Sequence, residues 1–116
     1  MKFKLIMAMV EDGRTDAVTE AARGAGATGC TVVSNARGEG LAPATTFFGL
    51  TLEGQSDMVL LIVEEHLSRK ILEAISVAGG FEDEQGAGMA FQIDIEDAVG
   101  LRSQIEKIQT EIEDEL

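Results

Sequence analysis

The sequence predicts a single α+β domain in which helices pack on an antiparallel sheet. Several short segments carry apolar residues with the period of two that is typical of strands. Two longer segments instead carry apolar residues at the spacing of one helix face. The chain has 116 residues, 45% of them hydrophobic, which suits one domain with a modest core.

The strand patterns differ in strength along the chain. The run Met58-Val59-Leu60-Leu61-Ile62-Val63 is the strongest, and β-branched residues support a strand around Val32 and Val33. A glycine-rich loop with the only proline follows at 37–44. We predict strands at 2–10, 28–35, 47–53, 58–63 and 89–95.

Helical spacing marks three segments. The first, at 14–25, has the apolar stripe Val18, Ala21, Ala22 and Ala25. The second, at 66–78, has the stripe Leu67, Ile71, Ala74, Ile75 and Ala78, and Gly79-Gly80 ends it. The third, at 102–116, follows Leu101 and has the stripe Ile105, Ile108 and Ile112.

Apart from the segment at 47–53 and the C-terminal helix, these elements follow the order strand, helix, strand, strand, helix, strand. This is the ferredoxin-like βαββαβ arrangement, an antiparallel sheet with two helices on one face. We therefore predict a ferredoxin-like domain over residues 1–101 and a C-terminal helical extension over residues 102–116.

Two of the predicted strands, 2–10 and 58–63, are largely apolar on both faces. In 2–10, Phe3, Leu5, Met7 and Met9 point one way, and the residues between them are also mostly apolar. Burying one Leu-sized side chain is worth about 1.5–3 kcal/mol, so an uncovered second face favours association. We expect this face to contact another subunit. The alternative is a monomer that covers the face with its own C-terminal helix.

The charge and the cysteine count exclude several classes of protein. A net charge of −12 disfavours nucleic acid as a partner, and it either keeps an oligomer soluble or docks the protein on a basic surface. One cysteine allows no internal disulfide, and one cysteine with one histidine argues against a zinc site. The N-terminus is unlike a signal peptide and no apolar run is long enough to span a membrane, so we expect a cytoplasmic protein.

The residues show no catalytic constellation. There is no nucleophile-elbow pattern and no Walker loop, and the adjacent Glu64 and Glu65 would not face each other on a helix. We expect no enzyme activity. Cys30 is expected to be a buried, inert thiol. His66 is expected at the surface at the start of a helix, with a pH sensor as the alternative.

Three stretches together resemble the PII signalling family. They are the segment from Val18 to Val32, the segment Arg37-Gly38-Glu39-Gly40, and the segment Gly86-Ala87-Gly88-Met89-Ala90-Phe91. The resemblance covers roughly residues 2–101 and rests on order and spacing. It implies a homotrimer that holds adenine nucleotides in clefts between subunits and regulates a partner protein, such as a membrane transporter to which it would bind peripherally.

The resemblance also implies where the ligand and the partner bind. The ligand cleft would be lined by Met9, Thr31, Arg37, Gly38, Gly40, Gly86 and Gly88. Glycine independently suits such a site because it lets backbone N–H groups approach an anion, although an ordinary turn is the alternative for each one. The loop 37–48 corresponds to a shortened T-loop. Its partner-binding residues would be Leu41, Pro43, Phe47 and Phe48.

The chain departs from the family pattern at its basic residues. Met89, Asp97 and Gly100 stand where the family has a lysine and two arginines that neutralise phosphates. Their loss should weaken triphosphate binding, so the expected effector is AMP, ADP, a cyclic nucleotide or bicarbonate, with no resident cofactor or metal. The chain has no tyrosine, which excludes tyrosine uridylylation. A structural or metal-tolerance trimer related to the divalent-cation tolerance proteins is the alternative function.

Overall fold

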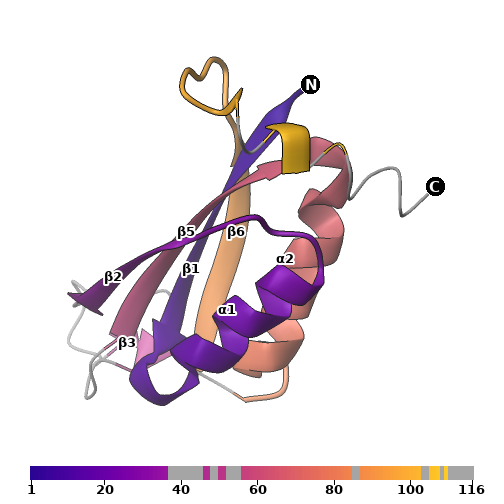
Figure 1. Cartoon of the computed structure of the whole chain (residues 1–116). Helices are drawn as coiled ribbons and strands as arrows, with labels where there is room; N and C mark the ends of the chain where they lie inside the picture. Colours follow the sequence, from indigo (N-terminus) through magenta and orange to yellow (C-terminus); the bar gives the residue numbers. More distant parts are fainter. Residues whose placement is uncertain are drawn as a thin grey trace.

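The computed structural model describes residues 1–36, 46–47, 50–51, 56–84, 87–102, 105–107 and 109 (Figure 1). Its main sheet consists of β1 (Phe3–Glu11), β2 (Thr31–Ala36), β5 (Ser56–Glu64) and β6 (Gly88–Asp94). A short 3-10 turn, η1 (Asp12–Arg14), leads from β1 into helix α1 (Thr15–Gly24). Helix α2 (Glu65–Gly79) follows β5 without a loop.

The sheet has the strand order β2-β5-β1-β6, and all neighbouring strands are antiparallel. Both helices lie on the same side of the sheet (Figure 1). Each helix joins two strands that are separated by a third strand in the sheet, as in the ferredoxin-like βαββαβ arrangement. The predicted fold class is confirmed.

The core lies between the sheet and the helices. Alternate residues of β1 and β5 point toward the helices, and those within 6–10 and 57–63 are buried. The helices contribute stripes at helical spacing, and Ile71 and Ile75 of α2 are both 0% exposed. The central members of this core are Ile6, Ala8, Val10, Val18, Ala22, Val59, Leu61, Val63, Leu67, Ile71 and Ile75.

The predicted strand at 47–53 is wrong. In its place are two short strands, β3 (Thr46–Phe47) and β4 (Leu50–Thr51), which pair antiparallel with Phe47 opposite Leu50. Two segments that pair antiparallel cannot belong to one continuous strand. The prediction ran one strand through Gly49, although glycine is depleted in strands.

The other face of the sheet is apolar and carries neither helix. Cross-strand pairs such as Met9 with Met58 and Met9 with Met89 place the members of this face side by side. Several are substantially exposed, including Phe91 at 39% and Ile93 at 50%. We call this surface the open face. It consists of Phe3, Leu5, Met7, Met9, Val33, Met58, Leu60, Ile62, Met89, Phe91 and Ile93.

The C-terminal part is described only in pieces. Residues 102, 105–107 and 109 are helical, and the Ile105 N–H donates to the Leu101 carbonyl at 2.9 Å. The remainder of the predicted helix at 102–116 lies outside the described residues. Among the helices that the structure describes, none is both long enough and apolar enough to cross a membrane.

Candidate ligand-binding site

Three of the predicted ligand residues lie in the described part of the chain. Met9 is near the end of β1, Thr31 begins β2, and Gly88 begins β6. Four others, Arg37, Gly38, Gly40 and Gly86, lie outside the described residues, as do the predicted partner residues Leu41, Pro43 and Phe48. Phe47 belongs to β3.

The structure brings two of these residues together. Val10 pairs with Gly88, and the Met9 carbonyl oxygen would lie 2.5 Å from a Cβ atom at Gly88. Thr31 pairs with Leu60, which in turn pairs with Met7, so Thr31 points to the same side of the sheet as the open face and is separated from β1 by β5. Met9 and Thr31 therefore share one face of the sheet, while Gly88 lies at the end of the sheet where α2 returns to β6.

Gly88 has a structural requirement of its own. A Cβ atom there would overlap Cε1 of Phe81, and a Cβ atom at Gly79 would overlap the same atom. The Phe81 ring thus packs over both glycines, at the end of α2 and at the start of β6. A side chain at Gly88 would collide with this ring and with the backbone of β1, whether or not a ligand binds.

The loop between α2 and β6 is hydrogen-bonded through its described residues. The Glu84 N–H donates to the Gly80 carbonyl at 3.0 Å, and the Ala87 N–H donates to the Glu84 carbonyl at 3.2 Å. Ala87 is buried, whereas Glu82, Asp83 and Glu84 are exposed. The three acidic side chains therefore face solvent.

A buried carboxylate fixes β2 just before the loop 37–48. Asp57 Oδ2 accepts a hydrogen bond from Thr15 Oγ1 at 2.7 Å, and Asp57 Oδ1 accepts one from the Asn35 N–H at 3.4 Å. The pairing of β2 with β5 is irregular between Val33 and Ala36. Asn35 has φ of 61°, a left-handed conformation that asparagine tolerates better than most residues. Asp57 therefore connects α1 to the start of the predicted partner-binding loop.

Two half-open hollows lie near the candidate residues. One, of about 580 Å³, lies between α2 and β6 and is lined by Leu72, Val77, Phe81, Gly88 and Met89, among others. The other, of about 590 Å³, lies where the N-terminus meets the segment after β6. Both volumes are in the range of small-molecule sites.

The second hollow contains cations that our sequence prediction missed. Asp97 and Gly100, the positions at which we noted lost arginines, line it together with Lys2 and Arg102. The two cations are accompanied by Glu96, Asp97 and Glu106, so the lining remains acidic. This grouping leaves no local sequence pattern, because its members come from opposite ends of the chain. The two segments are joined by a hydrogen bond in which the Ile95 N–H donates to the Phe3 carbonyl at 3.2 Å.

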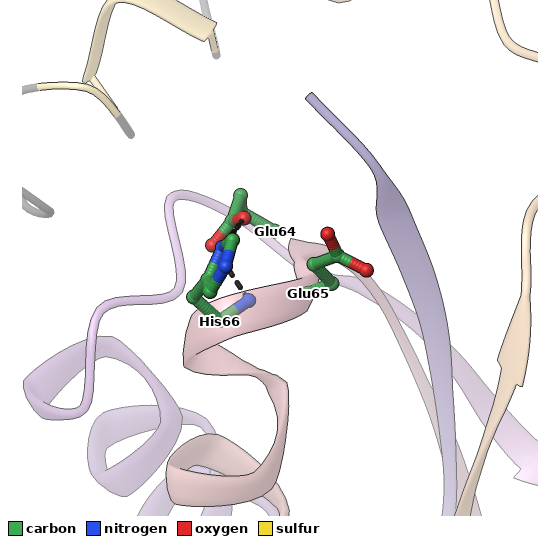
Figure 2. A group of neighbouring side chains, drawn as sticks. All are labelled: Glu64, Glu65 and His66. Atoms are coloured by element: carbon green, nitrogen blue, oxygen red, sulfur yellow. Dashed lines mark hydrogen bonds and ion pairs between the residues drawn. The ribbon is translucent and has the colours of Figure 1, made fainter.

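Glu64, Glu65 and His66 form a cluster at the start of α2 (Figure 2). Glu64 is 2% exposed and caps the helix, accepting from the His66 backbone N–H at 2.7 Å. His66 Nδ1 lies 2.5 Å from Glu64 Oε1. This hydrogen bond, followed by the charge of Glu64, raises the pKa of the His66 imidazole above its ordinary value.

The cluster is held together by its own capping bonds. Figure 2 shows the Glu65 carboxylate directed away from the pair formed by Glu64 and His66. The three side chains offer atoms within 4.8 Å of one another, which a metal ion could use, but the Nδ1 atom of His66 is already engaged by Glu64. We assign the cluster to helix capping. The His66 side chain is largely exposed at the helix start, as predicted.

The prediction of a buried Cys30 is wrong. Cys30 is exposed and immediately precedes β2. β2 is an edge strand of the sheet, and its residues from Thr31 to Asn35 are all exposed in the single chain. An edge strand has a sheet neighbour on one side only, so the apolar sequence of β2 does not ensure burial.

The order of elements and the sheet topology define the class of ferredoxin-like α+β domains. The sequence matches the nitrogen regulatory protein P-II family over residues 3–105, and the chain therefore belongs to this family. The resemblance found in the sequence is confirmed. No curated protein matches the chain.

Solved structures share the fold at low sequence identity. CPII from Thiomonas intermedia K12, a nitrogen regulatory PII-like protein, in its apo form is 24% identical, covering 82% of this chain and 90% of that chain, with a TM-score of 0.64. CPII bound to ADP, AMP and acetate is 22% identical, with 83% and 90% covered and a TM-score of 0.59. A PII-like signalling protein from Thermus thermophilus is 24% identical, with 82% and 87% covered and a TM-score of 0.59.

Proposed function

We propose that this chain is a non-catalytic PII-like regulator that forms a homotrimer and binds an adenine nucleotide in the clefts between its subunits. The observation that carries the proposal is the open face, which runs across all four strands of the main sheet and includes Met9. Membership of the P-II family and the ADP and AMP bound to CPII support the ligand class.

The open face supports assembly on physical grounds. A single chain leaves apolar side chains of four strands partly in contact with water, and contiguous apolar patches of this kind mark interfaces. Burying them between copies removes that contact without any change in the core. Met9 and Gly88 lie near one end of the sheet, whereas Thr31 lies level with Met7 on the edge strand β2. The proposed clefts would therefore use both this end and this edge of the sheet.

The charges favour a ligand with few phosphates. The protein carries a net charge of −12, and the hollow beside Asp97 holds more acidic than basic side chains. A triphosphate would be repelled more strongly than a monophosphate or a diphosphate. We infer that AMP, ADP or a cyclic nucleotide binds more tightly than ATP.

Ligand binding would act on the partner through the loop 37–48. The base of this loop joins β2, where Asp57 holds the backbone of Asn35. A ligand that binds one arrangement of the loop better than another shifts the population toward that arrangement. Leu41, Pro43, Phe47 and Phe48 would then engage or release a regulated protein, for which a membrane transporter is our candidate.

Titration calorimetry of the purified chain tests the proposal. We expect heat with AMP or ADP, weaker heat with ATP, and a particle of three times the 12.3 kDa chain mass in light scattering. Cyclic AMP and bicarbonate are titrated in parallel. A folded trimer that gives no heat with any nucleotide would reject the nucleotide function, and a 12.3 kDa particle would reject the assembly.

A metal-tolerance trimer is the second candidate. The observation in its favour is the grouping of Glu64, Glu65 and His66, whose ligand atoms lie within 4.8 Å of one another. Thermal melting with Zn²⁺ or Cu²⁺ separates the two functions. Stabilisation by the metal that is lost in His66→Gln would support this candidate, and an unchanged melting temperature would reject it.

A further inference from the structure

The geometry points to Arg14 as a positioning residue that holds the loop between α2 and β6 in the shape that presents Gly88 to the ligand. This inference rests on the proposed nucleotide-binding function. Arg14 lies in η1, directly after β1, and is distant in sequence from the loop that it holds.

The Arg14 guanidinium joins three segments. Its Nη1 donates to the carbonyl oxygen of Gly79, the last residue of α2, at 2.9 Å. Its Nη2 donates to Oε2 of Glu84, in the loop, at 2.5 Å. Its Nε lies 3.7 Å from Oε2 of Glu11, at the end of β1. The end of one strand, the end of a helix and the loop therefore meet at one side chain.

Arg14 supplies what the end of α2 lacks. The last carbonyl groups of a helix have no partner within it, and the helix dipole makes this end favourable for a cation. The last turn of α2 contains no basic residue of its own. Arg14 provides both the hydrogen bond to Gly79 and the positive charge from a different element.

The loop geometry is fitted to the guanidinium. Gly80 has φ of 68°, the left-handed conformation that ends many helices. A Cβ atom at Gly80 would overlap Arg14 Nη1, so Arg14 occupies the space that a side chain would need. An arginine is suited to this position because its planar fork donates in two directions, whereas lysine presents a single point of charge.

The bonds made by Arg14 continue to the start of β6. Glu84, which Arg14 holds by its side chain, also donates its N–H to Gly80 and accepts from the Ala87 N–H. Ala87 is 2% exposed and directly precedes Gly88. An isolated surface ion pair contributes little to stability. The pair of Arg14 and Glu84 instead sets the path of the loop that leads directly into β6, which begins at Gly88.

Arg14 has an electrostatic role at the same place. Glu82, Asp83 and Glu84 are all exposed in this loop, and an anionic ligand near Gly88 would meet their charges. The pairing with Arg14 neutralises Glu84. Loss of Arg14 therefore loosens the loop and also increases the negative charge beside the ligand.

A double-mutant cycle tests the inference. Arg14→Gln, Glu84→Gln and the double variant are compared with the unchanged protein by calorimetry with AMP and with ADP. We expect Arg14→Gln to weaken binding by about threefold to thirtyfold and the two substitutions to be non-additive, because the residues act as a pair. The control cycle uses Arg23 and Glu20, an exposed pair on α1, and should change affinity less than about twofold.

Hydrogen exchange in the absence of nucleotide gives an independent readout. The Glu84 and Ala87 amides should exchange faster in Arg14→Gln and at the unchanged rate in Arg23→Gln. Arg14→Lys keeps the charge without the fork, and we expect it to fold normally, yet to bind nucleotide more weakly than the unchanged protein. It serves as the test variant if Arg14→Gln does not fold.

The possible failures are distinguishable. If the wild-type protein binds no nucleotide, the proposed function is overturned, and with it the ligand role of Arg14. If the wild-type protein binds nucleotide but the mutant cycle is additive, or amide exchange at Glu84 and Ala87 does not change, the positioning role is overturned and the proposed function stands.

Discussion

Gly88 lies where three parts of the chain approach one another closely. The Phe81 ring and the Met9 carbonyl group both occupy the space that a side chain at this position would need. The backbone of β1 cannot move without disturbing the centre of the sheet. Gly88 therefore combines a packing requirement with its predicted place in the ligand cleft.

Replacing Gly88 by alanine should destabilise the protein. The added methyl group would lie 2.5 Å from the Met9 carbonyl oxygen, and forcing extra volume into a packed site costs about 1–3 kcal/mol. Gly29→Ala is the matched control, because a Cβ atom at Gly29 meets nothing within 4 Å. Chemical denaturation measures both free energies of unfolding. Equal values for the two variants would contradict the packing argument.

His66 should make stability depend on pH. Its pKa is raised in the folded protein by the hydrogen bond and charge of Glu64, whereas the unfolded imidazole titrates at about 6.5. The stabilisation is therefore complete below about pH 6.5 and is lost as the pH rises through the folded pKa. The free energy of unfolding should be higher for the wild-type protein than for His66→Gln. This difference should be larger at pH 6 than at pH 9.

Denaturation curves of both proteins across this range provide the measurement. Arg69→Gln, in an exposed pair with Glu73 on α2, is the control, because arginine stays charged throughout. A difference between the unchanged protein and His66→Gln that stays constant or grows with pH would show that the imidazolium is not stabilised by Glu64.

At the scale of the elements, Asp57 connects the start of α1 with the irregular end of β2. Its two carboxylate oxygens accept from Thr15 and from the backbone of Asn35, and the side chain is almost fully buried. The bond from Thr15 is the costlier one to lose because it is buried, whereas the exposed Asn35 can exchange its partner for water. The start of the loop 37–48 thus depends on one residue of β5.

Asp57→Ala should destabilise the protein by about 1–3 kcal/mol, because it removes two hydrogen bonds to a charged group, one of them buried. The amide exchange of Asn35 should also accelerate. Asp16→Ala, at an exposed position in the first turn of α1, is the control and should cost much less. Similar losses for the two aspartates would indicate that Asp57 does not hold the base of the loop.

Most elements could be predicted because their apolar patterns are long and regular. For the helices predicted at 14–25 and 66–78, both the first and the last residue lie within one position of those of α1 (Thr15–Gly24) and α2 (Glu65–Gly79). The prediction failed at 47–53, where pairing of Phe47 with Leu50 makes a hairpin. Two-residue strands are too short to leave a periodic pattern, so the hairpin could not be recognised in this way.

At the scale of the whole molecule, the open face is the largest unexplained feature of a single chain. The apolar residues predicted on both faces of β1 and β5 are indeed divided between the core and this surface. Arg102, Ile105 and Glu106 near the C-terminus line a hollow with residues 1–3 at one end of the sheet. Contact with further copies is the arrangement that we propose for this face.

Phe91→Asp should break the proposed trimer and leave the chain folded. Phe91 is 39% exposed in the single chain, so a charge there is tolerated by the fold but not within an apolar interface. Val77→Asp is the control, because Val77 is 81% exposed on α2, on the side of the sheet away from the open face. Light scattering and circular dichroism give mass and folding. A Phe91→Asp trimer as stable as the control would exclude this face as the interface.

The site was predicted less completely than the fold. The sequence indicated Met9, Thr31 and Gly88 through the family resemblance, and the structure places the first two on one face. It did not indicate Arg14, or the cations Lys2 and Arg102 beside Asp97. None of these has a local pattern, because each acquires its surroundings from segments that are remote along the chain.

The order of the four strands of the main sheet and of α1 and α2, the two apolar faces of the central strands and the family were determined by the sequence itself. These properties depend on neighbours a few residues apart, which a periodic pattern records. The tertiary structure decided that Phe81 covers Gly79 and Gly88, that Asp57 reaches Asn35, and that Arg14 bonds to residues 65 and 70 positions away. Such contacts depend on the path of the chain through space, since each forms only after β1, α2 and β6 have packed together.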